Sequence, residues 1–104
     1  ELERTPDPMV ENALIERLNY DKKVNVRLAA AEALIKYSNS EEVKTVFVNA
    51  LDTEKNPTIQ IALMQFLVEI KDLRARAPME KLLEESETPT YLKEILSQGL
   101  QELY

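Results

Sequence analysis

The side chains of this sequence that could do chemistry are four serines and a cluster of glutamates at Glu84, Glu85 and Glu87. A serine becomes a nucleophile only beside a general base, most often histidine, and the chain contains neither histidine nor cysteine. The commonest zinc ligands are therefore also missing, and the glutamates fall at an expected helix end, where a solvated acidic cluster is the usual outcome. We predict a protein that is not an enzyme and that holds no metal and no cofactor. The serines are Ser38, Ser40, Ser86 and Ser97.

The charge balance limits the possible partners. Acidic side chains outnumber basic ones by 19 to 13, which gives the 104-residue chain a formal net charge of −6. Nucleic-acid binding depends on cations that neutralise phosphates, so we expect no nucleic-acid partner. The apolar runs are far shorter than a membrane span of about 20 residues, and we expect no membrane insertion of this segment. The opening ELERTPDP contains no targeting peptide, so we expect a soluble domain from a longer protein, in an undetermined compartment.

The elements that position these side chains are expected to be helices. One glycine and five prolines leave too few turn-forming residues for a series of β-hairpins. In the run VRLAAAEALIKY the apolar residues recur at i, i+4, i+7, i+8 and i+11, which places them on one face of an α-helix. A strand would instead alternate. The residues of this face are Val26, Ala30, Ala33, Leu34 and Tyr37.

Capping residues mark where the helices begin. Asp7, Asn56 and Thr88 each precede a proline, so we interpret them as N-caps followed by proline at the first helical position. Ser40, followed by two glutamates, is a fourth start signal. The predicted helices cover residues 8–19, 24–37, 41–51, 57–71, 73–85 and 89–103.

The apolar pattern repeats every 33 residues. The shift aligns Val26 with Ile59 and Leu92, and Leu34 with Leu67 and Leu100. The helices that precede these keep the same register until one extra residue in the loop EESETPT shifts the third unit by one. Short helices that cannot bury their own apolar faces are often stacked copies of one unit. We therefore predict an all-α fold, an α-solenoid of about three helical hairpins in one domain over residues 1–104, with units at about 8–39, 40–72 and 73–104.

Two residues are unfavourable inside these helices. Pro78 lies about one and a half turns into its predicted helix, where it should remove a backbone hydrogen bond and bend the axis. Gly99 costs roughly 1 kcal/mol relative to alanine in a helix interior. Because its equivalents in the earlier units are Ala33 and Phe66, we interpret Gly99 as a point of close approach to the paired helix.

The string DKKVNVRLAAAEALIKY, which begins at Asp21, resembles the HEAT-repeat family of α-solenoids, in particular the short bacterial units. DLRARAPMEKLLEE resembles the first helix of such a unit, including its kinking proline at Pro78. The resemblance covers nearly the whole chain and implies a non-catalytic module for protein–protein interaction or scaffolding. It also implies that Asp21 pairs with Arg27 near the turns. The second unit has Glu54 and Gln60 at these places and the third lacks the pair, so a continuous charged ladder is not implied.

A second resemblance concerns the amino-terminal part of the chain. LERTPDPMVENALIERL, with the repeat that follows, is similar to soluble C-terminal segments of bacterial membrane proteins of the anti-sigma or zinc-finger regulator type. The alternative function that this implies is a regulatory segment of a membrane-associated, anti-sigma-like protein. The cysteine and histidine ligands of a zinc finger are not present in the sequence.

An apolar strip on the second helices is the predicted partner-binding site. With Val26 at zero and 100° per residue, the predicted core residues centre near about 20°, and a second apolar set falls between about 140° and 200°. The predicted core residues are Val26, Ala29, Ala30, Ala33, Leu34 and Tyr37. The members of the second set in the first two units are Leu28, Ala31, Ile35, Ile61, Met64 and Val68. We predict that they form an exposed strip for a protein or peptide partner, such as an amphipathic helix, or for self-association with a second copy.

The strip has other interpretations, and the third unit differs from the first two. The strip could be covered by other parts of a larger protein or be tolerated as surface, and a helical-repeat protein that handles nucleic acid or chromophores is the remaining functional class. In the third unit Glu94, Ser97 and Gln101 occupy the places of the strip. We therefore predict that this unit is a capping repeat with a polar outer face.

Overall fold

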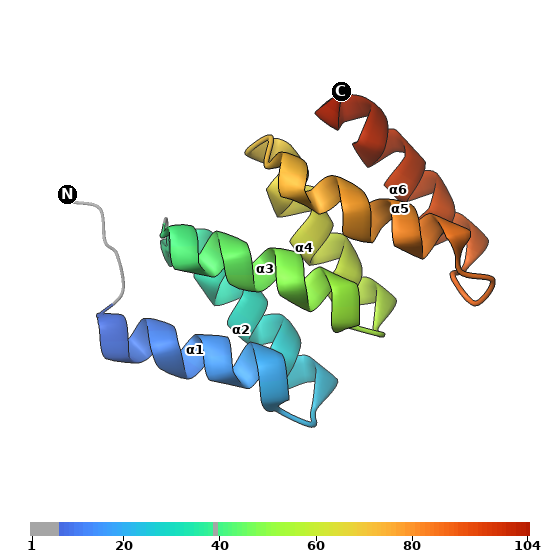
Figure 1. Cartoon of the computed structure of the whole chain (residues 1–104). Helices are drawn as coiled ribbons and strands as arrows, with labels where there is room; N and C mark the ends of the chain where they lie inside the picture. The colour runs from blue at the N-terminus through green and yellow to red at the C-terminus, as the bar shows by residue number, and fades with distance from the viewer. Residues whose placement is uncertain (1–6, 39) are drawn as a thin grey trace.

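A computed structural model describes residues 7–38 and 40–104, which form three helical hairpins and no strand (Figure 1). The hairpins stack in chain order, so the prediction of an all-α solenoid is confirmed. The helices are α1 (Pro8–Tyr20), α2 (Val24–Tyr37), α3 (Glu41–Thr53), α4 (Pro57–Glu69), α5 (Arg76–Glu84) and α6 (Thr90–Leu103), with a 3-10 turn, η1 (Leu73–Ala75), before α5.

The helices form two layers. The first helices α1, α3 and α5 lie side by side in one layer, and the second helices α2, α4 and α6 lie behind them in the other (Figure 1). Each second helix packs against its own first helix and also directly against the second helix of an adjacent hairpin. The result is an elongated body with principal extents of 40 × 31 × 18 Å. The second helices therefore have helical neighbours on two sides.

Three of the four predicted helix starts are confirmed by their capping hydrogen bonds. The Asp7 carboxylate accepts a bond of 2.7 Å from the backbone N–H two residues later, and the Ser40 hydroxyl accepts one of 3.1 Å from the N–H three residues later. The Asn56 side chain accepts from the N–H groups two and three residues later, at 2.9 and 3.3 Å. Each bond satisfies an N–H that has no carbonyl partner within the helix.

The fourth predicted start, at Thr88, is wrong. The Thr88 hydroxyl donates instead to the carbonyl oxygen of Leu82 at 2.7 Å, which ties the loop to the end of α5. Pro89 becomes the N-cap of α6 and makes no side-chain capping bond, so the helix begins at Thr90. The Leu82 carbonyl, which also accepts the N–H of the C-cap residue Glu85, thus takes the threonine hydroxyl in place of the capping bond.

Pro78 also differs from its prediction. The segment begins with the 3-10 turn η1 and becomes α-helical only at Arg76, so Pro78 lies in the first turn of α5. The N–H groups of a first turn have no partner within the helix, and proline removes no hydrogen bond there. The side chain of Pro78 is buried. The change from 3-10 to α-helix thus accommodates the proline, in place of a kink within one continuous helix.

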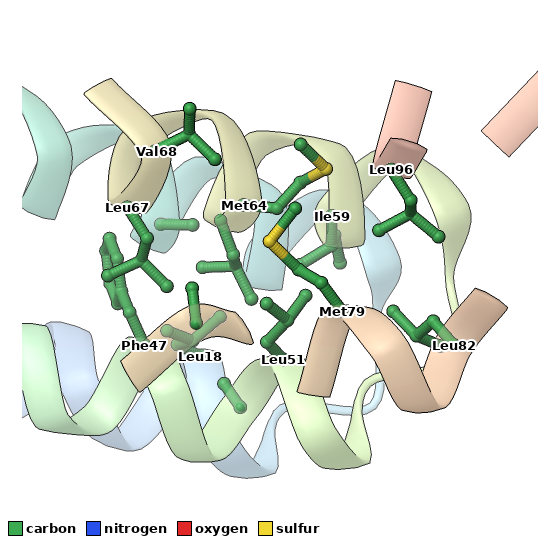
Figure 2. Packing of buried hydrophobic residues seen from close by; sticks show 14 of the residues in the cluster. Leu18, Phe47, Leu51, Ile59, Met64, Leu67, Val68, Met79, Leu82 and Leu96 are labelled. Carbon is green, nitrogen blue, oxygen red and sulfur yellow. The ribbon is translucent and has the colours of Figure 1, made fainter. Parts of the chain in front are cut away.

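The core runs through all three hairpins (Figure 2). The register equivalents Leu34 and Leu67 are fully buried and Leu100 is 8% exposed, as expected for one core position repeated three times. Phe47 and Phe66 meet edge to face, with their ring centroids 5.5 Å apart. Aromatic pairs favour this geometry, and the contact joins the two helices of the central hairpin.

Candidate functional site

The predicted apolar strip is not an exposed surface. Ala31, Met64 and Val68 are 0%, 2% and 5% exposed, so the prediction of exposure is wrong for these three residues. The other three members are half-buried and pack against the core; they are Leu28, Ile35 and Ile61. Conversely, Ala29 and Tyr37, which were predicted to be core, are exposed.

Stacking explains why the exposed and buried faces of the second helices differ from the prediction. In α4 the buried residues spread over about half of the helical wheel, because one side faces α3 and the next faces α6. Gly99 of α6 lies against this second side: a Cβ atom added to it would be 2.7 Å from the end of Met64 and 3.4 Å from Val68. The apolar set between about 140° and 200° is therefore the contact surface for the next hairpin.

A groove between α4 and α6 is a concave site in the described part of the chain. Its volume is about 550 Å³, within the range of about 300 to 1,000 Å³ that is common for binding pockets. Its floor combines three buried residues with the half-buried Ile95, and its rim is polar and exposed. The floor consists of Met64, Val68, Ile95 and Gly99, and the rim of Gln65, Glu69, Glu94, Gln98 and Glu102.

Close packing around Gly99 forms the floor. A Cβ atom at this position would be 2.7 Å from the methyl group of Met64 and 3.0 Å from that of Met79. Met64 and Met79 lie next to one another in Figure 2. Met79 belongs to α5, the helix paired with α6, so the predicted close approach of Gly99 to its paired helix is confirmed. Gly99 also lies close to Met64 of α4, in the preceding hairpin. Two flexible thioether side chains therefore lie directly beneath the groove.

The rim of the groove is acidic. Glu69, Glu94 and Glu102 are exposed, and no lysine or arginine belongs to the lining. The nearby Lys71 donates from its ammonium group to the main-chain carbonyl of Glu102 at 2.6 Å, which satisfies a carbonyl of the last turn of α6. The rim carboxylates form none of the ion pairs found among the described residues. The site thus offers negative charge above an apolar floor.

The acidic rim was not predicted, although the sequence contains a signal for it. Gln65 and Glu69 on α4 recur 33 residues later as Gln98 and Glu102 on α6. With Ile59 as zero, these positions fall between about 240° and 280° on the wheel, which is the solvent-facing direction of the second helices. Polar pairs repeated in register identify the outer face more directly than an apolar set, because apolar residues also line the contacts between hairpins.

A partly buried ion pair joins the first two hairpins. The Arg27 guanidinium donates two hydrogen bonds to the Glu54 carboxylate, from Nε at 3.1 Å and from Nη2 at 3.0 Å. The Asn56 backbone N–H donates a third bond to this carboxylate, at 3.0 Å. These contacts raise the pKa of Arg27, chiefly through the hydrogen bond to Glu54. Arg27 also donates to the backbone carbonyl of Asp21 at 3.0 Å, so the expected pairing with the Asp21 carboxylate is replaced by an ion pair with the next hairpin.

Two of the four serines form hydrogen bonds that connect parts of the fold, and the other two are exposed. Ser38 and Ser40 both donate to the Glu11 carboxylate, which links α1 to the loop between α2 and α3. Ser86 and Ser97 are exposed. Within residues 7–38 and 40–104, no group of three or more carboxylates could hold a metal ion. None of the helices in these ranges has the length and apolarity needed to cross a membrane.

Comparison with known proteins gives one match. A family model described as HEAT repeats matches residues 11–100, which include the whole of the groove except Glu102. No curated protein and no solved structure matches the chain. The similarity to anti-sigma regulators is not tested by these comparisons and stays a prediction.

Proposed function

The chain belongs to the HEAT-repeat family, and we propose that it binds an amphipathic, basic segment of a partner protein in the groove between α4 and α6. HEAT repeats generally mediate protein–protein interaction or scaffolding. The observation that carries the proposal for this chain is the combination of an apolar floor with a rim that contains three exposed carboxylates and no cation.

Each part of the groove has a role in this proposal. Ile95 and the methyl groups of the floor would contact apolar side chains of the partner, and the flexible end of Met64 could adjust to their shape. Glu69 and Glu102 stand at equivalent places on α4 and α6, so they would contact lysine or arginine residues along the bound segment. The net charge of −6 would favour the approach of a basic segment.

The proposal modifies the predicted partner-binding strip. Met64 and Val68 remain site residues as parts of the groove floor. The other four members would act indirectly, by holding the hairpins in place; they are Leu28, Ala31, Ile35 and Ile61. A binding partner would therefore contact the apolar floor between α4 and α6 and the polar rim above it.

A peptide library tests this proposal. Helical peptides displayed on phage would be selected against the wild-type domain and counter-selected against Glu69→Lys with Glu102→Lys. We expect the selected peptides to carry lysine or arginine beside an apolar face. Their affinity should fall at least about tenfold for the charge-reversed domain, since two contacts with opposite charge become repulsive.

A matched control separates the groove from the overall charge. Glu84→Lys with Glu87→Lys makes the same change in net charge at exposed positions on and after the end of α5. Peptide binding to this control should stay close to that of the wild type. Equal loss in both variants, or amide shifts in nuclear magnetic resonance spectra that map outside α4 and α6, would contradict the proposed site.

A further inference from the structure

The first hairpin carries most of the large apolar side chains that are exposed in the described part of the chain. Of nine such side chains, five belong to this hairpin. Val10 on α1 is 50% exposed, whereas its register equivalent on α3, Val43, is 2% exposed. Residues of the same kind at equivalent places thus differ in exposure because a hairpin precedes α3. The five side chains are Met9, Val10, Tyr20, Val24 and Tyr37.

A hollow between α1 and α2 lies at this end of the stack. Its volume is about 440 Å³, and apolar side chains form most of its lining. We call its lining the N-terminal face, with Leu14, Arg17, Val26, Ala29 and Ala33 as its principal members. The alanines of α2 are therefore partly surface: Ala29 is exposed and Ala33 is half-buried.

The N-terminal face corresponds to one half of a contact that recurs within the molecule. Gly99 of α6 stands at the place of Ala33, and it lies against Met64 and Val68 of the preceding second helix. Those two residues correspond by register to Ala31 and Ile35 of α2, and α2 packs against α4 as α4 packs against α6. A helix that carries apolar side chains with the spacing of Ala31 and Ile35 therefore has the shape to occupy the N-terminal face.

A charged group at the same end specifies the partner further. Asp21 stands at the place of Glu54, and both carboxylates accept a hydrogen bond from the N–H two residues later. Glu54 also receives the guanidinium of Arg27 from the preceding hairpin. No cation of the described residues forms an ion pair with Asp21. An arginine on an incoming helix could complete this site as Arg27 completes the next one.

A second copy stacked in the same direction does not suit this face. The C-terminal end of the stack presents Glu94, Ser97 and Gln101 at the places where α2 and α4 carry their apolar contact residues. All three are exposed, and burying a carboxylate against alanine and valine side chains would be unfavourable. Head-to-tail assembly of identical chains is therefore disfavoured.

We propose that the N-terminal face binds an amphipathic helix of a partner protein, with an arginine at position i that pairs with Asp21 and apolar residues at i+1, i+4 and i+8 that pack on Ala29 and Ala33. This is the spacing of Arg27, Leu28, Ala31 and Ile35 in α2. The surface and the ligand differ from those of the acidic groove, so the two proposals can fail separately.

A fluorescent peptide with the sequence of residues 21–38 is the probe, held helical by a lactam between the side chains at positions 32 and 36. Fluorescence anisotropy with the full chain should give a Kd below about 100 µM. In the protein, Ala29→Glu should weaken binding at least about tenfold, and Asp21→Asn about threefold or more. Asparagine keeps an acceptor for the Lys23 N–H and so preserves the turn.

Control substitutions in the peptide and in the protein test whether binding occurs at the N-terminal face. A peptide with glutamate at position 31 should not bind, and this test leaves the protein unchanged. Ser97→Glu at the opposite end and the groove variant Glu69→Lys with Glu102→Lys should bind the wild-type peptide normally. Equal binding of the peptide to Ala29→Glu and to the wild type would overturn the proposal, as would loss of binding in the groove variant alone.

Discussion

Replacing Arg27 with methionine and Glu54 with glutamine, singly and together, should show how strongly the ion pair couples the first two hairpins. Methionine keeps much of the apolar stem of arginine, and glutamine keeps an acceptor for the Asn56 N–H that bonds to Glu54 at 3.0 Å. The double-mutant cycle removes the contribution of the bonds that Arg27 makes to main-chain carbonyls, because these are absent from both variants that carry methionine.

The structure places the expected magnitude between two limits. An exposed ion pair contributes about 0.2 to 1 kcal/mol, whereas breaking a buried pair costs about 3 to 5 kcal/mol. The side chains of Arg27 and Glu54 are 18% and 7% exposed, and they are joined by two hydrogen bonds in parallel. We therefore expect each single substitution to lower the free energy of unfolding by about 1.5 to 3 kcal/mol, with a coupling of about 1 to 2.5 kcal/mol.

Urea unfolding followed by circular dichroism measures all four free energies. The coupling should change little between low and moderate salt, because ions screen a partly buried pair less than an exposed one. A coupling below about 0.5 kcal/mol would refute the reasoning, since that is the value of a surface pair. A change in the slope of the unfolding curve would instead indicate that the hairpins no longer unfold together.

Three further outcomes are expected. Leu67→Ala should lower the free energy of unfolding by about 2 to 5 kcal/mol in urea titrations because Leu67 is fully buried, whereas Ala at the exposed Gln65 should change it by less than about 0.5 kcal/mol. Gly99→Leu should lower the free energy of unfolding by about 1 to 3 kcal/mol in thermal unfolding, because the larger side chain overpacks the core. Gly99→Ala should be nearly neutral, because a gain in helix propensity of about 1 kcal/mol offsets the cost of displacing the ends of two flexible methionine side chains. The pKa of Asp72 is held below its ordinary value chiefly by the hydrogen bond from the Arg74 side chain. The ionised Asp72 therefore adds its full stabilisation of the folded state above the unfolded pKa of about 3.9, and this stabilisation is lost as pH falls through the lower folded pKa. Denaturant midpoints measured at decreasing pH should consequently decline less for Asp72→Asn than for the wild type.

The repeat register could be predicted because it depends on contacts that recur in every hairpin. Leu34 and Leu67 are buried in the same way, since each fills the space between the two helices of its own unit. The helix starts at Asp7 and Asn56 could also be predicted from the sequence, because capping is a local interaction. Thr88 was mispredicted because its hydroxyl finds a partner six residues earlier, across a turn whose shape the sequence does not specify.

The exposed face of the second helices could not be predicted from a single helical wheel. Ala31 and Met64 are buried because the next hairpin covers them, and Ala29 is exposed because no hairpin in the described part of the chain precedes it. The same residue type thus has opposite surroundings two positions apart. The wheel gives the direction of each side chain, whereas its burial depends on which neighbouring hairpin lies in that direction.

The stacking of hairpins also affects how the chain reaches its folded state. The helices that pack most extensively are neighbours in sequence or one hairpin apart, so the segments that must meet are separated by only a few tens of residues. Little loop-closure entropy is then lost before contacts form, and proteins with such local contacts fold within microseconds to milliseconds. Because each hairpin packs on its neighbours, the first hairpin to form offers the next one a surface on which to order, and folding can start in any hairpin and spread along the stack.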